Sequence, residues 1–241
     1  QGWFDTSMPD LNQRHPLLAR YLVQNSIWWI EQADLSGIRE DTFSYADPAF
    51  LQQWTTSVLR EYPHFNIVGE EMQDKPHQIA YWQQGARNRE GYGAGLPSLM
   101  DFALSDALPA SLGEPDGWDK GLGRLYEILA SDHLYADPMK LMLFADNHDR
   151  SRIFSVLGED GDRLRTALVL VATLRGIPQV FYGTEILQTS PAERDDGRVR
   201  ADFPGGWPGD RVNAFTGEGL SAAQRHMQDW LRRLLQWRKT S

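Results

Sequence analysis

Carboxylate side chains end three separate apolar segments of this sequence. Asp41 closes residues 37–41, Glu70 closes residues 66–70, and Asp149 follows the apolar residues 141–144. Taken singly, each has an ordinary structural explanation: an ion pair that closes a strand, a solvated glutamate at a loop, or a polar turn. Together they indicate catalysis, because carboxylates act as nucleophiles, acids and bases, and active sites of parallel α/β proteins form where the strands end.

Polar neighbours of these carboxylates suit the same chemistry. Arg39 lies two residues before Asp41, so on a strand both side chains point to one face, and a guanidinium favours the ionised carboxylate. His148 can donate a hydrogen bond to a sugar hydroxyl, and Asp149 can accept two from a diol. No metal site is predicted, because His148 and Asp149 lack partner ligands at helical or hairpin spacing.

Short apolar segments that position these residues recur along the chain. Their starts lie 29, 32, 42 and 38 residues apart, which is the period of a strand–helix unit and predicts a parallel sheet. The candidate strands are Gly37–Asp41, Asn66–Glu70, Ser98–Leu104, Lys140–Asp146 and Pro178–Tyr182. Two connections, Met72–Leu96 and Thr189–Gly219, are long enough to suggest loops with a function.

Helical patterns alternate with the strands. Asp47 followed by Pro48 predicts a helix start, and Ser221 with Gln224 forms a capping box at the start of the last helix. A further helix is expected over Arg163–Arg175. In the helix expected at Pro16–Ala33, the residues at helical spacing on one face are Leu18, Tyr21, Leu22 and Trp28; in the helix after Pro48, the expected buried stripe is Phe50, Leu51, Trp54 and Val58.

The spacing of the strands bears on the reaction. Neighbouring strands lie about 4.8 Å apart. If the strands that end in Asp41 and Glu70 pair, their carboxyl groups come near the ~5–5.5 Å of retaining glycosidases, rather than the ~6.5–9.5 Å of inverting enzymes.

Bulk composition excludes several classes of protein. The net charge of −9 without a basic patch argues against nucleic acid or an anionic membrane as a partner, and no apolar run approaches the ~20 residues of a membrane span. The absence of cysteine excludes disulfides and thiolate sites. The nine tryptophans could stack on sugar rings, but most are expected in the core.

The segments 37–41, 69–70 and 144–149 resemble signature regions of the α-amylase family of glycoside hydrolases. Met8–Asn12 and Arg200–Trp207 resemble the neopullulanase and cyclomaltodextrinase branch, and Arg175–Gly183 resembles the family's eighth strand. The resemblance implies that Asp41 is the nucleophile, Glu70 the acid/base and Asp149 the transition-state stabiliser. Substrate-contacting residues are expected to be Arg39, Asn147 and His148, with Asp202 and Trp207 nearest the sugar in the last long connection.

Two positions depart from the family pattern. Glu40 stands where the family usually has an apolar residue, and Ser44-Tyr45 replace the Lys-His of many α-amylases. The second departure favours cyclodextrin- or pullulan-acting enzymes.

The resemblance also implies an architecture. Residues 1–241 are expected to form the C-terminal portion of a catalytic (β/α)₈ barrel, with strands four to eight and without the first three. The chain would then be a fragment, inactive by itself, that self-associates or pairs with an N-terminal piece. No cofactor is required, although calcium is compatible with the full-length enzyme, and a periplasmic or a cytoplasmic location would fit.

Three functions remain open from the sequence. The first is hydrolysis of α-glucosidic bonds in maltooligosaccharides, cyclodextrins or pullulan. The second is α-glucosyl transfer or isomerisation by an enzyme of the same family. The third is a non-catalytic carbohydrate-binding fragment.

Overall fold

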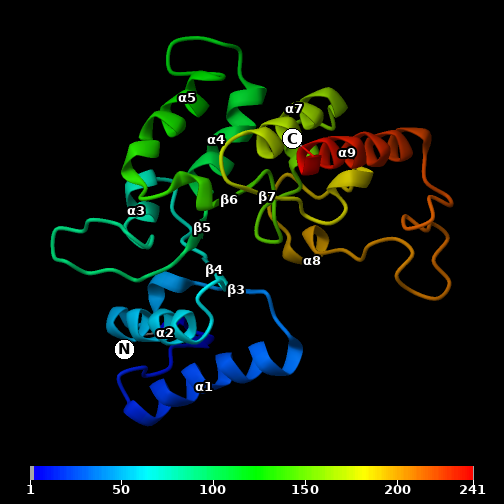
Figure 1. Ribbon diagram of the computed structural model, residues 1–241. Coiled ribbons are helices and arrows are strands. Elements are labelled where there is room, and N and C mark those ends of the chain that lie inside the picture. Colours follow the sequence, from blue (N-terminus) through cyan, green and yellow to red (C-terminus); the bar gives the residue numbers. More distant parts are fainter. Residues whose placement is uncertain (1–2, 241) are drawn as a thin grey trace. The chain divides into compact units, whose positions relative to one another are not determined.

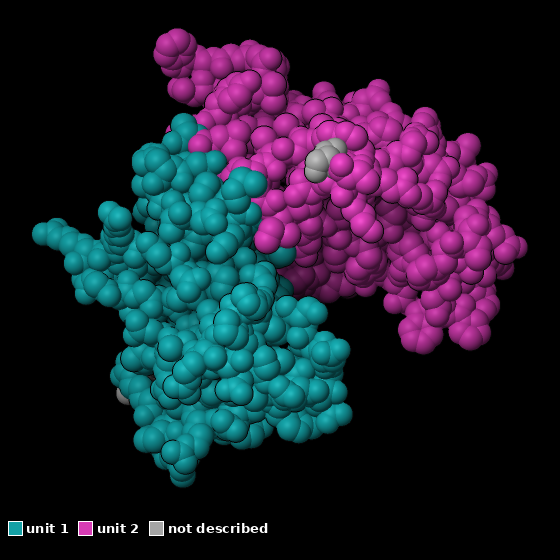
Figure 2. Space-filling model, viewed as in Figure 1, with its two compact units in different colours: residues 1–103, 130–142 teal, residues 104–129, 143–241 magenta. Residues whose placement is uncertain are grey.

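The computed structural model describes residues 3–240, which divide into two compact units (Figures 1 and 2). The first unit comprises the chain up to Ala103 together with Ala130–Met142, and it is teal in Figure 2. The second comprises Leu104–Leu129 and the chain from Leu143 onward, in magenta. Each unit is described below by itself.

Parallel strands form the centre of the first unit. Strands β3 (Gly37–Glu40), β4 (Asn66–Gly69), β5 (Ser98–Met100) and the start of β6 (Leu141–Phe144) pair in that order, all parallel. Glu40 is the partner of Gly69 in the register of β3 and β4. Asp41 and Glu70 therefore leave adjacent strands at the same level.

Two helices of the first unit begin where the sequence predicts. In α2 (Pro48–Glu61), Asp47 caps the N-terminus by accepting from the backbone N–H groups of Ala49 and Phe50, as predicted. The expected stripe of Phe50, Leu51, Trp54 and Val58 is buried. Helix α1 (Pro16–Ala33) has the predicted bounds, but its buried side chains are Ala19, Val23 and Ile30.

Of the four residues placed on one face of α1, Leu18 and Leu22 are half-buried and the other two are not. Tyr21 and Trp28 are exposed, together with Leu17. These apolar side chains lie on a helix whose other face already packs, so α1 presents a second apolar stripe to solvent.

The remaining elements of the first unit are short. Strands β1 (Trp3–Asp5) and β2 (Met8–Pro9) form an antiparallel pair ahead of α1. The long connection after β4 contains α3 (Pro76–Ala80), and short 3₁₀ turns lie at Phe43–Tyr45, Ser131–Leu134 and Pro138–Lys140.

The second unit contains the end of β6, strand β7 (Ile177–Gln179) and most of the later helices. These helices are α5 (Gly123–Ala130), α6 (Ile153–Val156), α7 (Gly161–Thr173), α8 (Asp196–Val199) and α9 (Ala222–Thr240), and a 3₁₀ turn lies at Thr184–Ile186. The predicted capping box of α9 is confirmed: the Ser221 N–H donates to Gln224 Oε1, and the Gln224 N–H donates to Ser221 Oγ.

Several predicted element bounds differ from the structure. The segment Ser98–Leu104 is a strand only to Met100, and α4 (Phe102–Gly113) begins two residues later. A short, mostly apolar segment does not by itself distinguish a buried strand from a buried helix. Strands β6 and β7 are shorter than predicted, and α7 begins at Gly161 because Asp160 caps it.

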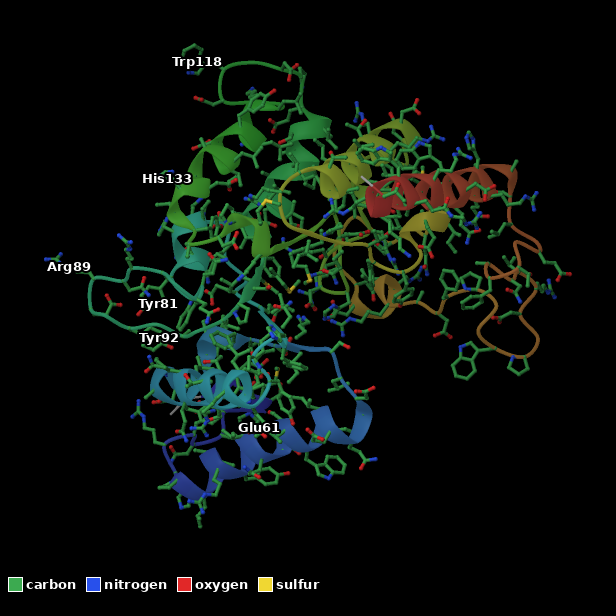
Figure 3. All side chains as sticks on the ribbon, in the orientation of Figure 1. Glu61, Tyr81, Arg89, Tyr92, Trp118 and His133 are labelled. Carbon is green, nitrogen blue, oxygen red and sulfur yellow. The ribbon has the colours of Figure 1, made fainter. Side chains whose placement is uncertain are left out.

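The expectation that most tryptophans lie in the core is wrong. Among the tryptophans whose side chains the structure describes, only Trp54 is buried. The exposed ones are Trp28, Trp29, Trp118, Trp207 and Trp237, and Figure 3 shows Trp118 at the tip of the loop before α5.

Candidate active site

Asp41 and Glu70 share one guanidinium in the first unit. Arg39 Nη1 donates to Asp41 Oδ1 at 2.8 Å, and Arg39 Nη2 donates to Glu70 Oε1 at 2.6 Å. The sequence predicted only the first of these contacts. Because the strand register holds Asp41 and Glu70 level, a single arginine can orient both carboxyl groups.

A strained residue completes the hydrogen bonding of Glu70. Thr42 lies in the left-handed region, with φ of 48°, which costs a β-branched residue about 1–2 kcal/mol. This turn aims the Thr42 N–H at Glu70 Oε2, at 2.9 Å. Both oxygens of Glu70 are therefore held, one by Arg39 and one by the backbone.

The two carboxyl groups have opposite environments. The Glu70 side chain is 3% exposed, whereas the Asp41 side chain is 64% exposed. Burial raises the pKa of Glu70, and Asp41 raises it further by its charge and its hydrogen bond, against the lowering effects of Thr42 and Arg39. A buried carboxyl with a raised pKa beside a solvated one is the arrangement that suits a general acid next to a nucleophile.

Gly69 brings the strand that carries Glu70 against its neighbour. A Cβ at this position would lie 2.5 Å from Cδ1 of Leu96, whose side chain is fully buried. The Leu96 side chain therefore packs directly against the Gly69 backbone. A larger residue here would displace Leu96 or shift Glu70.

Glu40 lines a groove beside Asp41. The groove has a volume of about 460 Å³, and its wall includes Glu40, Asp41, Asp10, Leu22 and Phe43. Burial raises the pKa of Glu40 to about 7, with a smaller contribution in the same direction from Asp41 and an opposing one from Arg39.

Replacement of Glu40 by Gln should stabilise the fold at pH 8 more than at pH 5. The pKa of Glu40 in the folded chain lies above its unfolded value of 4.5, so its favourable contribution is complete below pH 4.5 and is lost as the pH rises through about 7. We expect a gain of about 1–2 kcal/mol at pH 8 relative to pH 5, after allowance for solvent screening. Urea unfolding at the two pH values measures this difference.

Glu114→Gln is the matched control for Glu40→Gln. The Arg124 hydrogen bond holds the pKa of Glu114 below its usual value, so its neutralisation offers no gain at pH 8. If Glu40→Gln has the same effect at both pH values, Glu40 is solvated and this account of its environment is wrong.

Asp149 lies in the second unit, where basic groups surround it. Arg200 Nη2 donates to Asp149 Oδ1 at 2.8 Å, Arg194 Nη2 reaches the same oxygen at 3.2 Å, and His148 Nε2 lies 3.1 Å from Oδ2. The Asp149 side chain is 13% exposed. Asp196 binds both arginines and holds them as a pair.

The turn that carries Asp149 is fixed by the residue before His148. Asn147 is buried, and its Oδ1 accepts from the Asp149 N–H at 2.9 Å. Its Nδ2 has no hydrogen-bond partner among residues 3–240. In this structure Asn147 orients the turn.

The model of the α-amylase catalytic domain matches residues 2–241. The chain belongs to the α-amylase family. A cyclomaltodextrinase of Geobacillus thermopakistaniensis strain MAS1 is 27% identical over 189 residues, which is 77% of this chain and 30% of that protein. A maltogenic α-amylase of Bacillus acidopullulyticus is 25% identical over 186 residues, or 76% of this chain and 29% of that protein.

Solved structures of the family share the fold. The α-amylase of Geobacillus thermoleovorans, complexed with acarbose, superposes with a TM-score of 0.77 at 25% identity, over 100% of this chain and 51% of that one. The chain thus spans about a third or less of the two relatives named above and about half of this α-amylase. The predicted α/β class with a parallel sheet is confirmed.

Two of the predicted substrate-contacting residues lie in the second unit. Asp202 and Trp207 are exposed in the connection between α8 and α9. Their contact with sugar stays a prediction, as does the assembly of Asp41, Glu70 and Asp149 at one site. The predicted long connection Thr189–Gly219, which contains α8, also supplies Arg194, Asp196 and Arg200, whose contacts with Asp149 sequence reasoning missed. The spacing of Asp196 and Arg200, four apart, was the available signal.

Among residues 3–240, no three His, Asp or Glu side chains converge in a way that could hold a metal ion. Within the same residues, none of the helices combines the length and the apolar character needed to cross a membrane.

Proposed function

We propose that the complete protein is a retaining glycoside hydrolase that cleaves α-glucosidic bonds in maltooligosaccharides, cyclodextrins or pullulan. The observation that carries the proposal is the pair of carboxyl groups on adjacent strands, one buried with a raised pKa and one exposed, bridged by Arg39. The names of relatives that act on cyclomaltodextrins and starch support the substrate class.

The mechanism follows from the two environments. Glu70 gives its proton to the glycosidic oxygen as Asp41 attacks the anomeric carbon, so the bond to the leaving sugar breaks and a glycosyl ester of Asp41 forms. Glu70 then takes a proton from water, which attacks the same carbon and releases Asp41. Arg39, which binds both carboxyl groups, keeps them aligned through both steps.

Asp149 would stabilise the positive charge that develops on the sugar ring. Arg200, Arg194 and His148 fix the position of its carboxylate. We infer that His148 and Asp149 contact ring hydroxyls, and that Asp202 and Trp207 lie along the cleft. These roles rest on the resemblance to the family's motifs.

The strands of the chain fit the fourth to eighth strands of a (β/α)₈ barrel. The family resemblance supports this assignment, as does the share of the larger α-amylase that the chain covers. Strand β3 has a neighbour on one side only within the described residues, and α1, which packs against α2, exposes Leu17, Tyr21 and Trp28. A preceding strand–helix unit, from an N-terminal piece or a second copy, would cover both.

The released sugar is expected to keep the α-configuration. Double displacement inverts the anomeric carbon twice, and Asp41 and Glu70 extend from adjacent strands and are hydrogen-bonded to each other, closer than the ~6.5–9.5 Å that inverting enzymes need to admit a water. Proton NMR of the first-formed sugar, read before mutarotation, measures this. A β-anomer that appears first would contradict the double-displacement mechanism.

Glycosyl transfer is the second candidate function. A cyclomaltodextrin glucanotransferase of Geobacillus stearothermophilus is 28% identical over a match of 206 residues, which covers 81% of this chain and 26% of that protein. The same covalent intermediate serves both reactions, and the acceptor that reaches Asp41 decides between them. Incubation with maltotriose alone separates the two: a hydrolase forms only shorter sugars, and a transferase also forms longer ones.

A further inference from the structure

Arg152 is a charged side chain that is completely buried in the second unit, at 0% exposure. Its guanidinium donates to the Val199 carbonyl through both Nε and Nη2, at 3.1 and 2.8 Å, and to the Tyr182 carbonyl through Nη1. The guanidinium carbon also lies 4.0 Å from the centre of the Phe181 ring and 5.0 Å from that of Tyr182.

A buried guanidinium needs compensation, because removing a charge from water costs several kcal/mol. The aromatic faces and the carbonyl oxygens supply part of it. Asp146 supplies the opposite charge, and its carboxylate is itself held by the Ile153 N–H at 2.9 Å and by Thr184 Oγ1 at 3.2 Å. Arg152, Asp146 and the carbonyls of Val199 and Tyr182 thus form a buried polar cluster rather than a surface ion pair.

The contact with Val199 links this buried polar cluster to the surroundings of Asp149. Val199 is the residue immediately before Arg200, so a carbonyl fixed at Val199 also fixes the backbone from which Arg200 extends. Arg200 in turn donates through Nε to the His148 carbonyl at 3.1 Å and through Nη2 to Asp149 at 2.8 Å. The path from Arg152 to the Asp149 carboxylate therefore passes through two consecutive residues, Val199 and Arg200.

Arg152 also fixes the other segments that flank Asp149. Its backbone N–H donates to Ser190 Oγ at 2.9 Å, at the start of the connection that carries Arg194 and Arg200. It lies only three residues after Asp149 in the chain. One side chain and its own backbone thus hold the end of β7, the start of the connection and the base of Arg200.

We propose that Arg152 is a positioning residue that sets Arg200 against Asp149 by anchoring the Val199 carbonyl. The inference rests on the proposed function for its catalytic consequence, because Asp149 matters to turnover only if it acts on the sugar. The positioning itself concerns only residues of the second unit.

Arg152→Lys tests the anchor. Lysine keeps a positive charge opposite Asp146 but lacks the planar fork that reaches two carbonyls and stacks on the rings. Arg238→Lys is the matched control: Arg238 also binds two backbone carbonyls in this unit, those of Ala172 and Gly176 at 2.6 and 3.0 Å, but none near Asp149.

The readout is the Nε–H signal of Arg200 in ¹⁵N NMR spectra of the protein, assigned by its loss in Arg200→Lys. The Nε–H of Arg124, bonded to Glu114 at 2.9 Å, reports whether the unit stays folded. We expect Arg152→Lys to remove the protected Arg200 signal and keep that of Arg124, and Arg238→Lys to keep both.

Kinetics of the complete enzyme then show the consequence. In Arg152→Lys, Arg200 should no longer hold the Asp149 carboxylate in place. We therefore expect kcat to fall by about 10–100-fold with little change in KM, because this carboxylate acts in the transition state. Arg238→Lys should retain the wild-type kcat.

Two results would overturn the proposal. A protected Arg200 signal in Arg152→Lys would show that Arg200 is placed without the anchor, and loss of both the Arg200 and the Arg124 signals would show that Arg152 only maintains the fold. If the Arg200 signal is lost as expected but the wild-type protein hydrolyses no α-glucan, the positioning role stands and the proposed function fails.

Discussion

Asp41→Asn and Glu70→Gln are each expected to abolish measurable turnover of α-glucans by the complete enzyme. Asparagine cannot form the glycosyl ester, and glutamine cannot give the proton that the leaving sugar needs. For Glu70→Gln we expect a loss of roughly 10²–10⁴-fold, the usual share of a general acid. For Asp41→Asn the loss should be at least as large, and Asp149→Asn should be nearly as severe.

A substrate with an acidic leaving group separates the two roles. An aryl α-glucoside whose phenol leaves without protonation should restore most of the first chemical step in Glu70→Gln but none in Asp41→Asn. Both variants should keep the wild-type fold, because glutamine can still accept from the Thr42 N–H and Asp41 is exposed. An Asp41→Asn protein with a tenth of the wild-type rate would exclude Asp41 as the nucleophile.

The isolated chain of 241 residues is expected to show no family-typical turnover and to associate in solution. A (β/α)₈ barrel closes with eight strands, whereas the corresponding sheet of the described residues has five. The unpaired edge of β3 and the apolar stripe of α1 invite pairing with another chain.

Light scattering and a maltooligosaccharide assay on the same sample test this prediction together. Leu17→Lys with Tyr21→Lys, on the exposed face of α1, should reduce the association without disturbing the buried side chains of that helix. A stable monomer with ordinary amylase turnover would show that five strands suffice and that the partial barrel is misassigned.

Local signals in the sequence predicted local structure well. The N-cap at Asp47 and the capping box of Ser221 and Gln224 depend on neighbours in the chain, and both are present as predicted. The level placement of Asp41 and Glu70 was also predictable, since it needs only the pairing of consecutive strands.

The pattern of apolar residues in α1 did not by itself show which face of the helix is buried. Tyr21 and Trp28 lie at helical spacing, yet they are exposed, because what covers a helix face depends on other segments. Likewise, residues 98–104 are mostly apolar, and only tertiary packing decides that the segment changes from strand to helix at Phe102.

The contacts of the arginines around Asp149 were not predicted from the sequence, although the four-residue spacing of Asp196 and Arg200 was a signal. Arg152 follows the motif that contains Asp149, Arg200 begins the motif Arg200–Trp207, and both look like solvated turn positions. Arg152 is buried because Phe181 and Tyr182, from a strand end about thirty residues away, stack on it. Arg200 reaches Asp149 across 51 residues of sequence. Contacts of this kind depend on the path of a long connection, which composition does not specify.

Trapping of the glycosyl-enzyme tests the central claim most directly. A fluorinated α-glucosyl fluoride that forms the covalent intermediate faster than water removes it can be incubated with the complete enzyme, followed by digestion and peptide mass spectrometry. We predict one fluoroglucosyl group on the peptide that contains Asp41, and none in Asp41→Asn. An enzyme that turns over this reagent with Asp41 unlabelled, or with the label on another carboxylate, would contradict the assignment of Asp41 as the nucleophile.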